Sequence, residues 1–385
     1  MISDDSRHWI SYDIDGLAAV RSRVRLPELE RFRVDSVADP DIVISVRARV
    51  SGDRVLSLPG ESYIYREWAG SLTANFDIEP GRPTRVVVAP LLALSRHVLY
   101  TNVIEPLLRF VVASKGRMLV HAGCVSLFGH GVLFSAKTDT GKTATILRLL
   151  RDCGGTFLSD DMTIISADAI ASRYPKPLTI SAHTLRAVPH RKLSWRQRAG
   201  LSVQSRLHSR SGRSVGKWLG QHPVPIMALN SLVQAVIPPP KYMVDRLVPC
   251  GLGTQQPIET LFLIERGAPA TIEPVSAQEA LEQLVSNTAD AYEFPPFRVM
   301  APQLRIDGLT FDQVQEVERE VLRSALAKIE VVRMRVADFS WPQLVQSSLA
   351  PSLPTEEGES RPAAKPAPVL PLAAAIASRN LADQA

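Results

Sequence analysis

The chain of 385 residues has no uncharged apolar run of about 18 residues, the length that a membrane-spanning helix requires. Its three cysteines, Cys124, Cys153 and Cys250, have no metal-binding spacing and cannot all be paired in disulfides. Such sparse cysteine is typical of a reducing compartment. The first residues include acids and no apolar core, so we expect no secretory signal. The expected location is the cytoplasm, with a peripheral association at a membrane left open.

Acidic residues are absent from one long stretch of the chain. Between Asp168 and Asp245 there is no Asp or Glu, yet twelve Lys and Arg residues occur there, although the formal net charge of the whole chain is only +5. Such segregation of charge indicates an anionic partner or surface. In its central part, residues 183–225, arginines alternate with Leu and Trp. This mixture fits an anionic membrane surface or a phosphorylated substrate, and the alternative is an insertion with a solvated basic face. We do not expect nucleic acid, because no recognised binding module accompanies the charge.

Residues 131–143 are the most informative segment. An apolar run leads into a turn that ends in Gly-Lys-Thr, and apolar residues at helical spacing follow at once. This order matches the phosphate-binding loop G-x-x-x-x-G-K-[ST], or Walker A motif, in which backbone N–H groups and a helix dipole hold phosphate. The first glycine of the motif is replaced by Ala136. Because alanine tolerates a positive φ poorly, we expect the turn to differ slightly or to be strained. The candidate nucleotide-binding residues are Ala136, Lys137, Thr138, Asp139, Thr140, Gly141, Lys142 and Thr143.

The loop also predicts the cofactors. Lys142 is expected to contact the β- and γ-phosphates of ATP, and the hydroxyl of Thr143 is expected to ligate Mg²⁺. The alternative is a helix that begins with Gly-Lys-Thr by chance.

Two adjacent carboxylates, Asp160 and Asp161, interrupt an apolar strand predicted over 156–166. Carboxylates are costly to bury unless they bind metal, form pairs or do acid–base work. We expect one aspartate to hold Mg²⁺ and the other, with its pKa raised by its neighbour, to accept a proton from a hydroxyl. We take Thr143 and Asp160 as the expected metal ligands. The sequence around the two aspartates does not itself show which one binds metal and which one accepts the proton. The alternative is a turn in which both are solvated.

Residues 121–134, the loop, and Leu158 to Asp161 together resemble the catalytic core of HPr kinase/phosphorylase and its relatives, which are akin to phosphoenolpyruvate carboxykinases. The resemblance covers roughly residues 116–186. It implies ATP-dependent phosphorylation of a hydroxyl, with one aspartate as the base and His121 near the phosphates. This chain departs from the family at Ala136 and at Thr143, where the family has Ser. The alternative is that His121, beside Val120 on an apolar strand, is a satisfied core residue, which is the more usual role of such a histidine.

The family also has an arginine–glycine loop that contacts the transferred phosphate, and this chain holds no close copy. The nearest candidate is residues 208–213, with Arg210 and Arg213. Arginine suits the role because its planar fork matches phosphoryl oxygens. The alternative is an arginine-rich surface loop.

The pattern predicts three parts. Residues 1–112 read as a mainly β domain without a catalytic constellation, residues 113–345 as a mixed-sheet α/β (α+β) nucleotide-binding core of the HPr kinase type, and residues 346–385 as a disordered tail rich in Pro and Ala. Within the core we expect strands at 118–127, 131–136, 156–166, 261–265 and 329–336, and helices at 142–152, 276–288 and 309–329.

The leading interpretation is an ATP- and Mg²⁺-dependent kinase that transfers the γ-phosphoryl group to a hydroxyl on a protein, a peptide, or a small or lipid-linked molecule. The alternative is an ATP-responsive binding or scaffold protein without transfer, which Ala136 and the missing arginine–glycine loop favour. A third interpretation, nucleotide hydrolysis that powers a partner, lacks any recognisable switch element. The sequence identifies neither the acceptor nor whether the chain forms a homo-oligomer.

Overall fold

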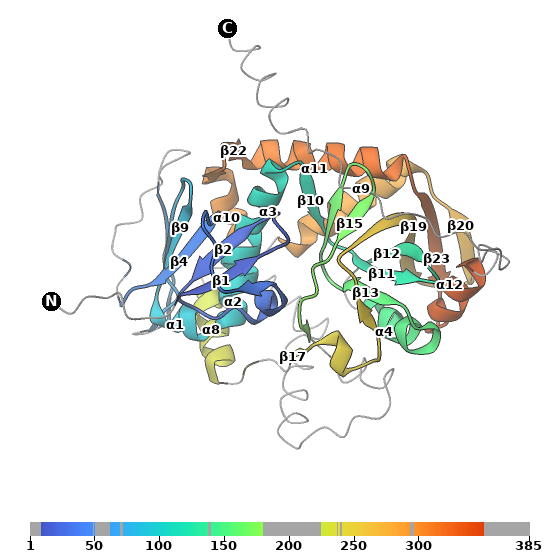
Figure 1. Ribbon diagram of the computed structural model, residues 1–385, viewed down its shortest axis with the longest axis horizontal. Helices are drawn as coiled ribbons and strands as arrows, with labels where there is room; N and C mark the ends of the chain where they lie inside the picture. The colour runs from blue at the N-terminus through green and yellow to red at the C-terminus, as the bar shows by residue number, and fades with distance from the viewer. Residues whose placement is uncertain are drawn as a thin grey trace, which may run out of the picture.

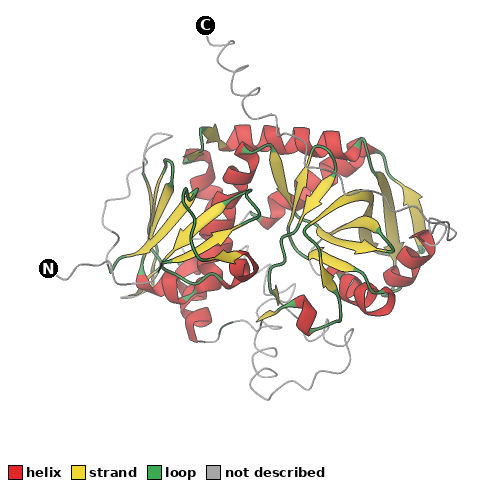
Figure 2. Cartoon of the chain, in the orientation of Figure 1, coloured by secondary structure: helices red, strands yellow, loops and turns green. Residues whose placement is uncertain are grey.

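The computed structural model describes residues 9–48, 50, 62–69, 72–137, 140–179, 225–236, 238, 241–292 and 296–349. These residues form a mixed α/β structure built on two large sheets with helices packed against them (Figures 1 and 2). None of the described helices is long and apolar enough to cross a membrane.

The N-terminal sheet has seven strands, and two of its pairings, β2 with β4 and β4 with β9, are parallel. Its strands in spatial order are β3 (Arg33–Val34), β1 (Ile10–Asp13), β2 (Ala19–Ser22), β4 (Ile42–Val46), β9 (Thr84–Val88), β8 (Phe76–Glu79) and β5 (Tyr63–Tyr65). A separate short ladder joins β6 (Trp68–Ala69) and β7 (Leu72–Thr73).

Within this sheet, the short helix η2 (Pro27–Phe32) lies between β2 and β3. Four helical segments connect the sheet to the core: α1 (Pro90–Leu94), α2 (Arg96–Leu99), the π-helical turn η3 (Tyr100–Ile104) and α3 (Glu105–Ser114). The sequence predicts one helix from about Leu92 to Val112 with an interruption near Pro106, but the irregular turn is η3. Pro106 itself lies in the first turn of α3, where a missing N–H breaks no helical hydrogen bond.

The core sheet has ten strands and mixes both orientations, as the glycine-rich hairpin at 129–131 predicts. Its main path is β10 (Arg117–Val120), β14 (Thr163–Ser166), β15 (Ile170–Ser172), β19 (Gln255–Arg266), β12 (His130–Ala136), β11 (Gly123–Leu127), β13 (Thr156–Ser159) and β18 (Gly251–Leu252). β23 (Glu330–Val336) pairs with β19, and β20 (Thr271–Pro274) pairs with β23. β12, β19 and β23 are parallel, so their carboxyl ends lie at one edge of the sheet.

The single strand predicted over 118–127 is wrong: it is two strands, β10 and β11, which separate at His121 and Ala122. β10 pairs with β14, whereas β11 pairs with β12 and β13. The apolar run is continuous in sequence because both strands are buried, so hydrophobicity alone does not reveal the break.

Helices cover both faces of the core sheet: α4 (Lys142–Cys153) and α12 (Trp341–Leu349) pack in one apolar cluster, and α9 (Ala277–Ala291) and α11 (Phe311–Leu326) pack in the other. The short segments α10 (Phe297–Met300) and η5 (Ala301–Gln303) lie between α9 and α11 in the chain. α11 begins where the sequence indicates, because Thr310 and Gln313 form a reciprocal capping box. α12 ends at the buried Leu349, so packed structure continues past the predicted boundary at residue 345; residues 350–385 lie outside the described part.

The remaining described elements are short. β16 (Leu178–Thr179), α8 (Ile226–Val236), β17 (Lys241–Tyr242) and η4 (Val244–Arg246) lie on either side of the basic segment in the chain, and the hairpin of β21 (Arg305–Ile306) and β22 (Leu309–Thr310) precedes α11. α8 packs on α1 and α2 of the N-terminal part, where the backbone N–H of Ala228 donates to Glu67.

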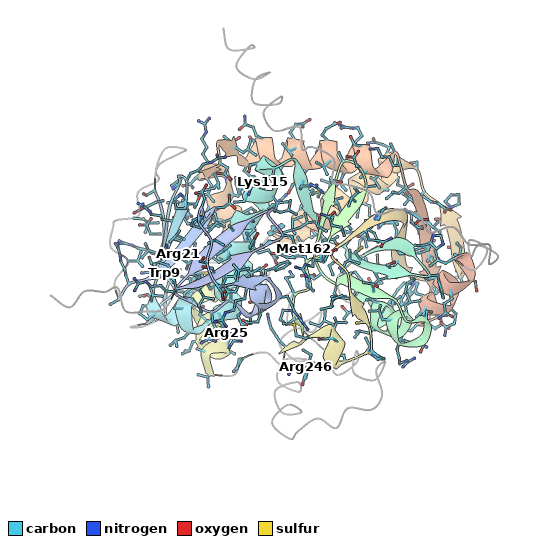
Figure 3. All side chains as sticks on the ribbon, in the orientation of Figure 1. Trp9, Arg21, Arg25, Lys115, Met162 and Arg246 are labelled. Atoms are coloured by element: carbon cyan, nitrogen blue, oxygen red, sulfur yellow. The ribbon has the colours of Figure 1, made fainter. Side chains whose placement is uncertain are left out.

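One apolar cluster is continuous from the N-terminal sheet through α3 to α9 and α11, and a second lies beneath α4 and α12. Met162, at the junction between the two sheets in Figure 3, belongs to the first cluster. The N-terminal part and the core therefore share a hydrophobic interior on one face.

A buried ion pair crosses this shared interior. Arg109 on α3 donates through Nε and Nη2 to the two carboxylate oxygens of Glu318 on α11, each at 2.6 Å. The guanidinium also lies 4.7 Å from the ring centre of Tyr292 and 5.3 Å from that of Phe311. The planar bidentate geometry satisfies both charges away from water.

Glu318→Gln should lower the free energy of unfolding by about 3–5 kcal/mol, because Arg109 would remain buried without its counter-ion. Glu320→Gln is the matched control on the same helix, since Glu320 pairs with Arg323 at the surface, and its expected cost is below about 1 kcal/mol. Urea denaturation of both variants measures the difference. A Glu318→Gln cost as small as that of the control would contradict the assignment.

Candidate active site

The phosphate-binding loop follows β12 directly and ends at α4. Ala136 is the last residue of β12, is buried, and pairs with Ile264 of β19. It is not among the described residues with positive φ. The expected strain at this position is therefore absent, because the chain is still an extended strand where the motif has its first glycine.

Gly141, in the loop, has a backbone conformation that favours glycine over other residues. Its φ is +126°, and a Cβ atom placed on it would lie 2.7 Å from a ring carbon of Phe339. The preceding Thr140 donates its hydroxyl to the carbonyl of Lys137 at 2.6 Å, and Arg266 donates to the carbonyl of Thr140 at 2.9 Å. Thr138 and Asp139 lie outside the described residues.

Thr143 joins the loop to the aspartate pair. Its hydroxyl donates to Oδ2 of Asp160 at 2.8 Å, and Nζ of Lys142 lies 3.5 Å from the backbone carbonyl of Asp161. The other oxygen of Asp160, Oδ1, is buried without a hydrogen-bond partner. Burial raises the pKa of Asp160, against the opposing effects of Lys142 and Thr143.

The hydroxyl of Thr143 and the unpaired oxygen of Asp160 are hard oxygen donors of the kind that Mg²⁺ prefers. Within the described ranges no three His, Cys, Asp or Glu side chains cluster to hold a metal by themselves. A cation here would therefore share its coordination with phosphate oxygens and water, as Mg²⁺ does at nucleotide sites. The residues present fit that group.

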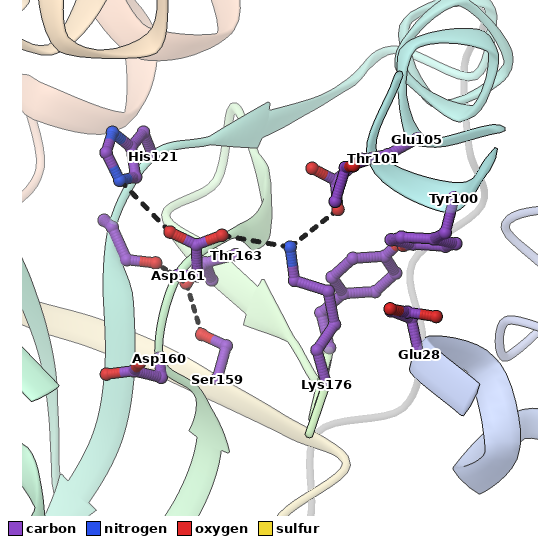
Figure 4. Close-up of polar contacts among 12 residues, drawn as sticks. Glu28, Tyr100, Thr101, Glu105, His121, Ser159, Asp160, Asp161, Thr163 and Lys176 are labelled. Atoms are coloured by element: carbon purple, nitrogen blue, oxygen red, sulfur yellow. Dashed lines mark hydrogen bonds and ion pairs between the residues drawn. The ribbon is translucent and has the colours of Figure 1, made fainter. Parts of the chain in front are cut away.

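His121 lies at the break between β10 and β11, and its ring is held at both nitrogens (Figure 4). Nδ1 is 3.1 Å from the carbonyl oxygen of Asn287 on α9, to which an Nδ1–H donates, and Nε2 is 3.2 Å from Oδ1 of Asp161. The backbone N–H of His121 also donates to Thr288. This buried histidine therefore reaches the acidic pair as well as filling the core.

Lys176 contacts Asp161 from the opposite side, which the sequence did not indicate. Its Nζ lies 3.1 Å from Oδ2 of Asp161 and 2.6 Å from Oε2 of Glu105, and its side chain is 12% exposed (Figure 4). The hydroxyls of Tyr100 and Tyr174 contact each other beside it. Lys176 belongs to the segment Tyr-Pro-Lys-Pro, whose prolines by themselves predict only a rigid extended turn.

Glu105 and Tyr100 come from the N-terminal part, in which we expected no functional constellation. The only local signal is the π-helical turn η3, which ends at the residue before Glu105. Irregular helical turns of this kind are frequent at functional sites, but they are not visible in a sequence pattern.

The two aspartates have different electrostatic environments. Surrounding protein atoms act to raise the pKa of Asp161, but Lys176 and then His121 outweigh them and hold it well below its ordinary range. The Asp161 side chain is 56% exposed, so an ionised carboxylate is accessible from the solvent. We expected the proton acceptor to have the raised pKa. The raised pKa instead belongs to Asp160, the aspartate bonded to Thr143.

The lysines also differ. Burial lowers the pKa of Lys142, an effect that Asp161 and Asp160 oppose. Burial acts in the same direction on Lys176, but Glu105 and Asp161 outweigh it, so the pKa of Lys176 is raised. Lys176 is therefore a fixed positive charge between two carboxylates.

The arginine candidates, Arg210 and Arg213, and almost all of the basic segment at 183–225 lie outside the described residues. The structure places the other named residues, namely Ala136, Lys137, Thr140 to Thr143, His121, Asp160 and Asp161, along the phosphate loop and the neighbouring strand ends.

No protein family model matches this chain, and no curated protein matches it. Among solved structures, it is similar to the Hpr(Ser) kinase/phosphatase from Coxiella burnetii, with 10% sequence identity and a TM-score of 0.25 over 61% of this chain and 95% of that chain. The likeness is distant, and at this TM-score it carries no argument about fold or activity.

Gly141→Ala should lower the free energy of unfolding by about 1–3 kcal/mol, because the added methyl group must displace Phe339 at a strained φ. Gly129→Ala is the control, since Gly129 also has a positive φ, +87°, but no atom within 4 Å of an added Cβ. Its cost should stay near 1 kcal/mol, about the value for backbone strain alone. Urea denaturation compares them, and equal costs would show that Phe339 does not restrict the loop.

Proposed function

We propose that the protein is an ATP- and Mg²⁺-dependent kinase that transfers the γ-phosphoryl group to a hydroxyl acceptor. The observation that carries this proposal is the pairing of Thr143 with Asp160 beside a separately held, ionised Asp161. In this proposal Asp160, which accepts from Thr143, holds the metal, and the solvent-accessible Asp161 receives the acceptor.

The loop residues serve to bind and orient the nucleotide. Backbone N–H groups at the start of α4 and the ammonium of Lys142 would hold the β- and γ-phosphates. Thr143 and Asp160 would hold Mg²⁺, which when bound neutralises charge on the phosphate oxygens. A bound cation would stabilise the Asp160 carboxylate and so oppose the rise in its pKa that burial causes.

Asp161 is assigned as the proton acceptor. In the transfer step the acceptor oxygen forms a bond to the γ-phosphorus, the bond between that phosphorus and the β,γ-bridging oxygen breaks, ADP leaves with the bond electrons, and the acceptor proton moves to Asp161. His121 and Lys176 fix the orientation of the carboxylate through one oxygen each. Positioning of this kind supplies most of the catalysis in phosphoryl transfer, where little covalent chemistry falls to the protein.

The alternative is an ATP-responsive binding or scaffold protein without transfer. One reason for it was the departure at Ala136, and this reason weakens because Ala136 needs no positive φ. A kinase forms ADP only when an acceptor is present, whereas a binding protein forms none. The acceptor itself, contact of the basic segment with a phosphorylated substrate or an anionic membrane, the cytoplasmic location and any homo-oligomer remain part of the proposal.

Lys142→Ala should reduce the affinity for Mg²⁺-ATP at least about tenfold, because the motif places the ammonium of its lysine against the β- and γ-phosphates. Isothermal titration calorimetry measures the affinity, and circular dichroism checks the fold. Lys328→Ala is the control, since Lys328 pairs with Asp168 at the surface. Unchanged affinity in a folded Lys142→Ala protein would refute the loop assignment.

Asp160→Asn and Asp161→Asn should have different effects. Asp160→Asn should weaken Mg²⁺-dependent ATP binding, whereas Asp161→Asn should spare binding and lower the transfer rate by roughly 10²–10⁴. Transfer is followed as incorporation of label from γ-labelled ATP into components of a cell extract. If both variants lost binding alike, or both kept wild-type transfer, the division of roles would be wrong.

A further inference from the structure

Arg266 and Phe339 form a rigid stack beside the phosphate loop that the proposed chemistry does not use. Arg266 is the last residue of β19, and Phe339 follows β23, the next parallel strand. The guanidinium carbon of Arg266 lies 4.6 Å from the centre of the Phe339 ring, and Nε of Arg266 donates to the carbonyl of Thr140 in the loop at 2.9 Å. The plane of the guanidinium is thus fixed against an aromatic face and against the loop.

Phe339 is itself fixed from three directions. Trp341 contacts it edge-on, with ring centres 5.5 Å apart and planes at 82°. Arg148 of α4 donates to its carbonyl at 3.3 Å, and Gly141 lies directly against its ring. The stack is therefore in place without a ligand, which is the condition for strong binding of a flat group.

The stack and the aspartate pair lie on opposite sides of the loop. In the core sheet β12 has β11 on one side and β19 on the other. Asp160 and Asp161 follow β13, which pairs with β11, whereas Arg266 and Phe339 follow β19 and β23. A nucleoside triphosphate whose γ-phosphate faces the aspartates directs its nucleoside away from them, toward the stack.

Arg266 also differs from its neighbours in charge pairing. On the adjacent strand, Arg335 pairs with Glu265 at 3.1 Å and Arg333 pairs with Glu273 at 3.1 Å. The side chain of Arg266 is exposed, and no carboxylate in the described part of the chain forms an ion pair with it. Its outer face is thus available to a ligand.

We propose that Arg266, supported by Phe339, forms a nucleobase-stacking subsite for a purine nucleoside triphosphate; this inference rests on the proposed function. A guanidinium is planar and weakly hydrated, and it stacks on aromatic faces. Because stacking uses only the face of the base, the subsite accepts adenine and guanine alike.

The test compares Mg²⁺-ATP with Mg²⁺-tripolyphosphate, an inorganic probe that has the phosphates and lacks the nucleoside. Isothermal titration calorimetry on the full chain gives both affinities. Arg266→Ala should lower the affinity for ATP about tenfold or more, a loss typical of one stacked base, and should leave the affinity for tripolyphosphate unchanged. GTP should lose affinity as ATP does.

Two further variants separate stacking from support of the loop. Arg266→Lys keeps the charge and a donor but removes the plane, so it should also lose affinity for ATP selectively. Arg335→Ala, on the neighbouring strand, should leave both affinities unchanged. If Arg266→Ala does not fold, as judged by circular dichroism, Arg266→Lys carries the test.

The outcomes are distinct. Equal loss of ATP and tripolyphosphate would mean that Arg266 only supports the loop, and no loss of either would mean that the base lies elsewhere; each overturns the inference and leaves the proposed function standing. A wild-type protein that binds neither ligand would refute the proposed function itself.

Discussion

The hydrogen bond from Thr143 to Asp160 is the contact on which the candidate site depends, because it joins the first turn of α4 to the break between β13 and β14. Asp160 and α4 both lie close to Gly123 of β11, and a side chain at that position would clash with both. A Cβ atom on Gly123 would lie 2.6 Å from the carbonyl oxygen of Asp160 and 2.5 Å from Ile146 of α4. The absence of a side chain at Gly123 thus lets the acidic pair lie directly beside the loop.

Helix α3 connects this centre to the rest of the molecule. Glu105 and Arg109 are four residues apart, so they share one face of the helix. Glu105 pairs with Lys176 in the site, and Arg109 pairs with Glu318 on α11. Two buried ion pairs one turn apart tie the N-terminal part to the core, and a change that shifts α3 would move Lys176 and with it Asp161. The N-terminal part therefore belongs to the site as well as to the fold.

Local patterns in the sequence predicted the elements whose signals lie within a few residues. The loop motif located β12 and α4, and the helix predicted over 309–329 corresponds to α11, Phe311–Leu326. The division of 118–127 into β10 and β11 was missed, because an apolar run looks the same whether one strand or two consecutive strands are buried. Residues 138 and 139 of the loop, and Arg210 and Arg213, lie outside the described residues, so those predictions stay untested.

The sequence by itself determined which chemistry-bearing residues exist and their spacing: a Gly-Lys-Thr turn, two adjacent aspartates and a histidine on a preceding strand. Only the tertiary structure distinguished the two aspartates, because their difference comes from partners distant along the chain. Asp161 lies between His121 and Lys176, whereas Asp160 is partly buried and accepts from Thr143. Glu105, Arg266 and Phe339 were likewise invisible, since a contact across 70 residues or more leaves no periodic trace in the sequence. The pKa of a carboxylate depends on burial and on the charges around it, and the packing of the folded chain sets both.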